Sequence, residues 1–211
     1  MKQRMKISDK NTQIGIDIGT SKICCAITEI NSDEESNKIL GVGNVPSQGI
    51  KKGSIVHRDR VMDAIETAVR EAELMAGIKV SRAMLSISGD HIRGINTQGA
   101  IAIQKGTTSN VPVEQEITQN DVSRVLELAK AVSLPVDREI LHILPQEYLI
   151  DTMDSIKDPV GMSGRRLEAK VHLITMAATT AKNLVNCVHE MAIDVEGLVF
   201  QALASAIATL D

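Results

Sequence analysis

The sequence predicts an α/β fold in which a meander of three β-strands is followed by helices alternating with strands, with one block inserted. Three observations support this prediction. Apolar residues alternate with small or polar ones in three segments before residue 46, a long amphipathic segment follows, and helical and extended patterns then alternate along the 211 residues. The length and the 43% apolar content suit one large or two small domains with a sizeable core.

The first three strands surround a short polar turn and a charged loop. Ile14, Ile16 and Ile18 alternate with small or polar residues, and the apolar run resumes over Ile23–Ile27. After the charged loop at 31–37, a third strand is expected over Lys38–Val45. Three consecutive strands predict an antiparallel meander.

A long amphipathic helix is expected over Arg58–Ala76, with Gly77 as its C-terminal cap. A strand over Ala83–Ser88 follows it. The apolar stripe of the helix repeats at helical spacing and comprises Val61, Ile65, Ala68, Val69, Ala72 and Met75.

The pattern then changes into the inserted block. His91–Gln104 alternates and is interrupted by glycines, and Lys105–Glu116 reads as a polar loop. Thr118 with Asp121 resembles a capping box that opens a helix, and Pro135 stops that helix.

The remaining elements complete the alternation. A strand over Arg138–Ile150 contains Pro145, which indicates an edge position or a bulge. The last expected elements are a strand over Leu167–Met176, a helix that Thr180 caps and that continues through Ala192, a strand over Val195–Phe200 and a helix over Ala202–Leu210.

The turn between the first two strands carries the candidate site. Gly19 permits backbone N–H groups to approach an anion closely, Thr20 and Ser21 add hydroxyl donors, and Lys22 adds a positive charge. Asp17 would repel a phosphate directly, but it suits contact through water with a Mg²⁺ ion. The alternative is an ordinary hairpin with a Gly-Thr-Ser turn.

Composition argues against several other functions. The net charge of −4 with interleaved signs does not suit a nucleic-acid surface. The lack of a long apolar run or a signal peptide leads us to expect a cytoplasmic chain. Cys24, Cys25 and Cys187 form no metal-binding pattern and are expected to be reduced structural thiols.

The order of elements resembles the ribonuclease-H-like base domain of actin-type ATPases. Four sequence blocks make this resemblance more specific. They are GIDIGTSK at 15–22 and, as the strongest signals, HILPQEY at 142–148, PVGMSG at 159–164 and KVHLIT at 170–175. These blocks resemble the FtsA family of bacterial cell-division proteins, and the resemblance covers almost the whole chain.

The FtsA resemblance implies an actin-like base domain at 1–84 and 167–211 and an inserted SHS2-type protein-interaction domain at 85–166. It implies an ATP and Mg²⁺ site in which Gly19, Thr20, Ser21 and Lys22 bind phosphate and Asp17 contacts the metal through water. A second lobe and a C-terminal amphipathic membrane helix are expected to lie beyond these residues, so the site would be half present.

The same resemblance implies an adaptor that polymerises and tethers the FtsZ ring to the cytoplasmic face of the membrane at the division site. FtsZ would bind the second lobe, and other division proteins would bind residues 85–166. The whole protein would be at most a weak ATPase, and this chain alone would be inactive. The alternatives are a pilus-assembly scaffold related to PilM and an enzyme of the sugar-kinase type.

Overall fold

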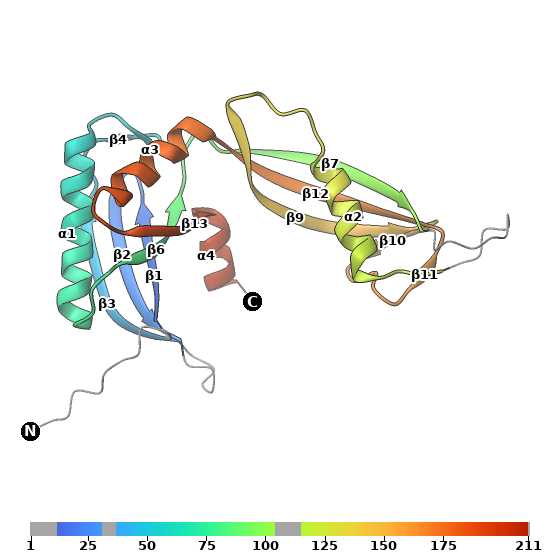
Figure 1. Cartoon of the computed structure of the whole chain (residues 1–211), viewed down its shortest axis with the longest axis horizontal. Coiled ribbons are helices and arrows are strands. Elements are labelled where there is room, and N and C mark those ends of the chain that lie inside the picture. Colours follow the sequence, from blue (N-terminus) through green and yellow to red (C-terminus); the bar gives the residue numbers. More distant parts are fainter. Residues whose placement is uncertain (1–11, 31–36, 104–114, 211) are drawn as a thin grey trace, which may run out of the picture. The chain divides into compact units, whose positions relative to one another are not determined.

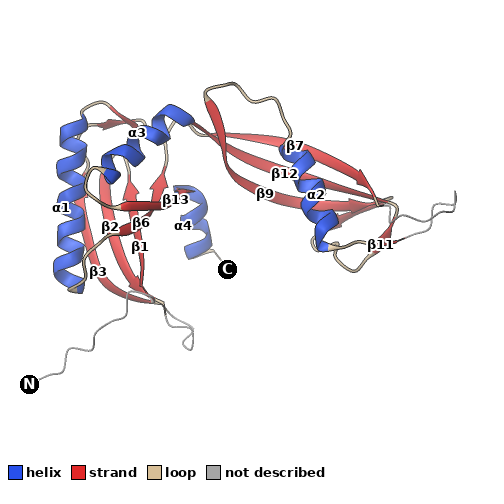
Figure 2. Cartoon of the chain, viewed as in Figure 1, coloured by secondary structure: helices blue, strands red, loops and turns tan. Residues whose placement is uncertain are grey.

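The computed structural model describes residues 12–30, 37–103 and 115–210. The chain forms two compact units, which we treat separately. The base unit comprises Met1–Ile92 and Ala177–Asp211, and the inserted unit comprises Arg93–Met176. Figure 1 labels the elements of both units, and Figure 2 shows that each combines strands with helices. Parts of the expected loops, at 31–36 and 104–114, lie outside the described residues.

The base unit is built on a five-stranded sheet of order β13-β6-β1-β2-β3. Strands β1, β2 and β3 form the predicted antiparallel meander, which is thereby confirmed. Strands β6 and β13 join the sheet in parallel with β1. The bounds are β1 Thr12–Ile18, β2 Lys22–Glu29, β3 Lys38–Pro46, β6 Arg82–Ile87 and β13 Asp194–Phe200.

Two helices, α1 (Arg58–Ala76) and α3 (Ala178–His189), contact each other and pack beside this sheet (Figure 1). Alternate residues of the strands are buried, as period-two side-chain geometry requires. Helix α4 (Gln201–Thr209) contacts β13 and β6. The fully buried large side chains of the sheet are Ile16, Ile18, Ile23, Ile27, Leu85 and Ile87.

Glycines in β3 allow the backbone of α1 to lie directly on the sheet. A Cβ atom placed on Gly43 would lie 1.8 Å from the carbonyl oxygen of Ala68, and one on Gly41 would lie 2.3 Å from that of Ala72. Both alanines are fully buried. The GVG sequence of β3 therefore serves close helix–sheet packing.

A short hairpin precedes α1 in the base unit. Strands β4 (Ile50–Lys51) and β5 (Ser54–Ile55) pair across a two-residue turn. Lys52 and Gly53 both have positive φ, 53° and 80°, which is the pattern of a type I′ turn. We call this segment the β4–β5 hairpin.

The inserted unit contains a four-stranded sheet of order β10-β9-β12-β7. Strands β7 and β12 pair in antiparallel register from Arg93↔Thr175 to Ala102↔Arg166. Helix α2 packs against β7, where a Cβ atom on Gly99 would lie 2.4 Å from the carbonyl oxygen of Val125. The bounds are β7 Arg93–Ala102, β8 Gln115–Glu116, α2 Gln119–Lys130, β9 Arg138–Ile150, β10 Met153–Ile156, β11 Ser163–Gly164 and β12 Arg166–Ala177.

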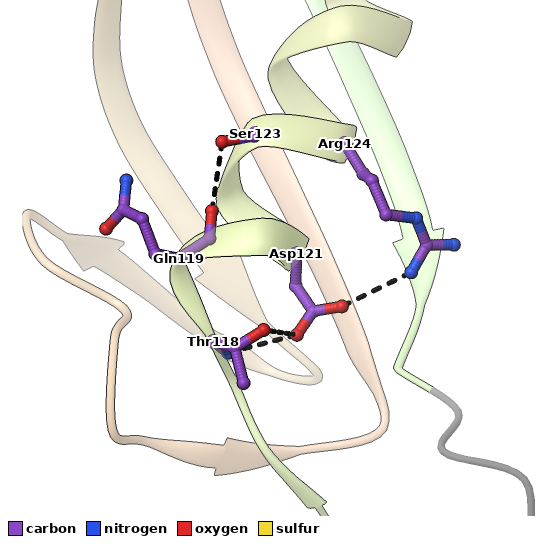
Figure 3. A network of polar contacts seen from close by, with 5 residues as sticks. All are labelled: Thr118, Gln119, Asp121, Ser123 and Arg124. Atoms are coloured by element: carbon purple, nitrogen blue, oxygen red, sulfur yellow. Dashed lines mark hydrogen bonds and ion pairs between the residues drawn. The ribbon is translucent and has the colours of Figure 1, made fainter.

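The capping box predicted for α2 is confirmed (Figure 3). The Asp121 carboxylate accepts hydrogen bonds from the backbone N–H of Thr118 at 3.0 Å and from its hydroxyl at 2.6 Å. The guanidinium of Arg124 lies 3.2 Å from the other oxygen of Asp121. Asp121 is 7% exposed, so this network fixes the start of α2 at a largely buried carboxylate.

Two expected boundaries differ from the structure. Leu85 lies within β6 and pairs with Ile16 of the base sheet, whereas Leu167 lies within β12 and pairs with β7. The compact units therefore divide at 92/93 and 176/177 rather than at 84/85 and 166/167. Helix α3 begins at Ala178, so the expectation that Thr180 caps it was wrong.

Candidate functional site

The candidate site forms where three parallel strands end together. Strands β1, β6 and β13 run in the same direction, and Asp17 pairs in register with Ser86. The Ser86 hydroxyl donates to Asp17 Oδ1 at 2.8 Å, and the Gln201 amide donates to Asp17 Oδ2 at 2.9 Å. The carboxyl edge of parallel strands is the usual ligand position in open α/β sheets.

The turn after Asp17 presents its donors to solvent. The N–H of Gly19 donates to the carbonyl oxygen of Lys22 at 3.0 Å, which closes the turn. Gly19 is buried, and a Cβ atom there would lie 2.9 Å from that same oxygen. Thr20, Ser21 and Lys22 are exposed. We call Gly19–Lys22 the anion loop.

Two backbone contacts fix the position of the anion loop. The N–H of Gly53 donates to the Thr20 hydroxyl oxygen at 3.3 Å. The N–H of Ser47 donates to the carbonyl oxygen of Ser21 at 3.0 Å. The hydroxyl of Thr20 thus accepts one hydrogen bond and retains its own proton for donation to a ligand.

The electrostatics of the site combine one carboxylate with one lysine. In the described part of the chain, Lys22 makes no ion pair, so its charge is open to an anion. Each oxygen of Asp17 accepts one side-chain hydrogen bond and keeps a second lone pair. The Cys24 thiol lies opposite Asp17 in the β1–β2 register, and burial is the main cause that raises its pKa.

The structure brings all five predicted site residues to one edge of the base sheet. Asp17 is the half-buried penultimate residue of β1, and the anion loop begins after the buried Ile18. Sequence reasoning missed Ser86 and Gln201, which lie 69 and 184 residues from Asp17. Only the parallel pairing of β6 and β13 brings these two side chains to the site.

Among the residues that the structure describes, no group of three or more His, Cys, Asp or Glu side chains is arranged to hold a metal ion. No helix within 12–30, 37–103 and 115–210 is long and apolar enough to cross a membrane.

The chain is similar along nearly its whole length to curated cell-division proteins named FtsA. It is 39% identical over 201 residues to the FtsA of Borreliella burgdorferi, covering 95% of this chain and 47% of that protein. It is also 39% identical over 206 residues to the FtsA of Escherichia coli K12, covering 98% of this chain and 47% of that protein. This chain belongs to the FtsA family.

The FtsA assignment also agrees with the inserted unit. A family model described as the SHS2 domain inserted in FtsA matches residues 89–175, close to the limits of the inserted unit. The chain spans about half the length of the curated FtsA relatives that it matches.

A solved structure supports the fold of this FtsA-family chain. A chain from a PilM–PilN type IV pilus biogenesis complex matches with a TM-score of 0.57 at 10% identity, covering 92% of this chain and 49% of that one. The predicted fold class, an actin-like α/β base with a small inserted α+β domain, is confirmed.

Proposed function

We propose that this chain supplies one phosphate-binding loop of a Mg-ATP site in a cell-division adaptor of the FtsA type. The observation that carries this proposal is the convergence of Asp17, Ser86 and Gln201 beside the exposed anion loop. Thr20, Ser21 and Lys22 bind phosphate through amides, hydroxyls and the lysine charge. Gly19, whose own N–H closes the turn, lets the backbone approach the phosphate closely.

In this proposed site, Asp17 contacts the Mg²⁺ ion through water and does not contact the phosphates. Its two remaining lone pairs suit hydrogen bonds from water bound to Mg²⁺, which retains several waters in proteins. Ser86 and Gln201 hold the carboxylate in one orientation, because each donates to a different oxygen. The bound Mg²⁺ supplies charge neutralisation for the phosphates.

Calorimetric titration with Mg-ATP tests this proposal. The donors come from one exposed loop, and hydrogen bonds in contact with water contribute little net free energy. We therefore expect a Kd of about 1 mM or weaker, equivalent to about 4 kcal/mol, without measurable hydrolysis. Lys22→Ala should abolish this binding, whereas Lys38→Ala, an exposed lysine at the start of β3, should leave it unchanged.

Two results would contradict this assignment. Equal Mg-ATP binding by the Lys22 and Lys38 variants would show that the anion loop is not part of the binding site. A Mg-dependent Kd near about 10 µM would show a complete site rather than one loop of a larger one.

The wider function that we propose follows the FtsA relatives. In it, the whole protein polymerises and tethers FtsZ to the cytoplasmic face of the membrane at the division site. FtsZ and the membrane are contacted by parts beyond residues 1–211, and other division proteins contact the inserted unit. A sugar-kinase activity is less well supported, because Asp17, the carboxylate beside the loop, is already held by Ser86 and Gln201.

The exposed face of α2 is our proposed partner surface. Glu127 on that face is 69% exposed and pairs with Lys130 within the helix. Glu127→Lys should therefore weaken association with other division proteins without lowering the Tm, because exposed pairs contribute only about 0–1 kcal/mol. Arg124 is unsuitable for this test, because it contacts the buried Asp121. Unchanged binding by Glu127→Lys, measured by analytical ultracentrifugation, would show that partners do not bind the exposed face of α2.

A further inference from the structure

We propose that the β4–β5 hairpin is a relay that couples the anion loop to Gly89–Ile92, the segment that leads into the inserted unit. The hairpin contacts both segments through its two-residue turn, Lys52–Gly53. A change at Thr20 therefore reaches Gly89–Ile92 through a single rigid connection. The response of the relay to a bound nucleotide rests on the proposed function. The contacts between the hairpin and the two segments do not depend on that proposal.

The first contact of the relay joins the anion loop to the turn. The N–H of Gly53 donates to the hydroxyl oxygen of Thr20. Gly53 is buried, although it lies at the tip of a hairpin, so its N–H depends on this acceptor. Reorientation of the Thr20 hydroxyl toward a phosphate would weaken or realign this bond.

The second contact joins the turn to Gly89 by direct backbone packing. A Cβ atom on Gly53 would lie 2.0 Å from the carbonyl oxygen of Ser88, and one on Gly89 would lie 2.4 Å from that of Lys52. Both glycines have positive φ, 80° and 140°. No side chain fits between the two segments, so neither one can move far without the other.

Polar contacts also join the turn to residues 89–92, which precede the inserted unit in the chain. The N–H of Asp90 donates to the carbonyl oxygen of Lys52 at 3.2 Å, and the side chains of these two residues form an ion pair at 2.9 Å. The N–H of Ile92 donates to the carbonyl oxygen of Gly89 at 3.1 Å. Arg93, the next residue, begins β7.

The relay is constrained on its other side as well. The carbonyl oxygen of Gly49 accepts from Val56 N–H at 2.8 Å and from His57 N–H at 3.1 Å, immediately before α1. The hairpin stem is therefore closed against the start of α1. Motion that begins at Thr20 passes to Gly89 more readily than it is absorbed within the stem.

Amide hydrogen exchange on the 211-residue chain tests the relay without a ligand. Thr20→Val keeps the side-chain shape and removes the acceptor for Gly53, whereas Thr20→Ser keeps the acceptor. We expect Thr20→Val to accelerate exchange about five-fold in both 52–53 and 88–92, the effect of losing about 1 kcal/mol. Thr20→Ser, and Thr28→Val on β2 as a control for the substitution itself, should stay within about two-fold.

Two outcomes of this first arm overturn the relay. One is faster exchange in the hairpin with unchanged exchange in 88–92. The other is equal exchange in 88–92 for Thr20→Val and Thr20→Ser. Either result means that Gly89–Ile92 does not respond to the Thr20 contact.

A second arm adds Mg-ATP at about 20 mM, well above a Kd of about 1 mM and enough to populate a several-fold weaker site. Changed exchange in 88–92 of the unsubstituted chain, lost in Thr20→Val, supports transmission of occupancy. Protection of the anion loop with no change in 88–92 overturns it. No protection of the anion loop contradicts the proposed nucleotide site, and the ligand-free comparison then decides the relay on its own.

Discussion

Replacement of Gly43 by alanine should destabilise the base unit more than any other single methyl addition to its sheet. The new Cβ would lie 1.8 Å from the carbonyl oxygen of Ala68, well inside contact distance. This atom belongs to the backbone of α1, so relief requires the whole helix to shift from β3. We expect a loss of about 3 kcal/mol in the free energy of unfolding, which lowers the Tm by about 6–12 °C.

The matched control for Gly43→Ala is Gly15→Ala in the same sheet. A Cβ atom on Gly15 has no heavy atom within 4 Å, and neither glycine has a positive φ. Gly15→Ala should therefore be neutral or stabilise the chain by up to about 1 kcal/mol. Circular dichroism during urea unfolding measures both variants. Equal stability of the two would show that α1 does not rest on β3 through its glycines.

The sequence predicted the elements whose signals are local. The apolar stripe and Gly77 marked α1, and Thr118 with Asp121 marked the start of α2. The alternation around DIGTSK marked β1, β2 and the anion loop between them. Each of these signals lies within a single helix, strand or turn, where the local residue pattern decides the geometry.

Long-range features could not be predicted from the sequence, for a physical reason. Ser86 and Gln201 reach Asp17 only because β6 and β13 pair in parallel with the strands beside them, and pairing order leaves no local trace. The expected unit limits differ from the structure for the same reason, since 84/85 falls within β6, which pairs with β1, and 166/167 falls within β12, which pairs with β7. The packing role of the GVG in β3 could not be predicted either, because it depends on α1 lying against those glycines.

Loss of the Arg138 side chain should have the second large effect, this time in the inserted unit. Its Nε and Nη2 donate to the hydroxyl oxygen of Thr175 at 3.1 and 2.8 Å, and Nη2 also donates to the Thr175 carbonyl oxygen at 3.0 Å. Thr175 is fully buried, and its hydroxyl donates to the carbonyl oxygen of Arg93 at 3.2 Å. Arg138 thus ties the start of β9 to the paired ends of β7 and β12.

We expect Arg138→Ala to destabilise the inserted unit by about 3 kcal/mol, because charge-assisted bonds to a buried partner are lost. Arg138→Lys should restore little of this, since an ammonium group cannot reproduce the fork of donors. Tyr148 is the only tyrosine of a chain without tryptophan and is buried in the inserted unit, so its emission during urea unfolding isolates this unit. The control is Lys157→Ala in the same unit, because Lys157 is exposed and its ammonium group donates to the surface carbonyl oxygen of Gln146. This exposed contact should contribute no more than about 1 kcal/mol. If the emission midpoints of the Arg138 and Lys157 variants coincide, the buried Thr175 does not depend on Arg138.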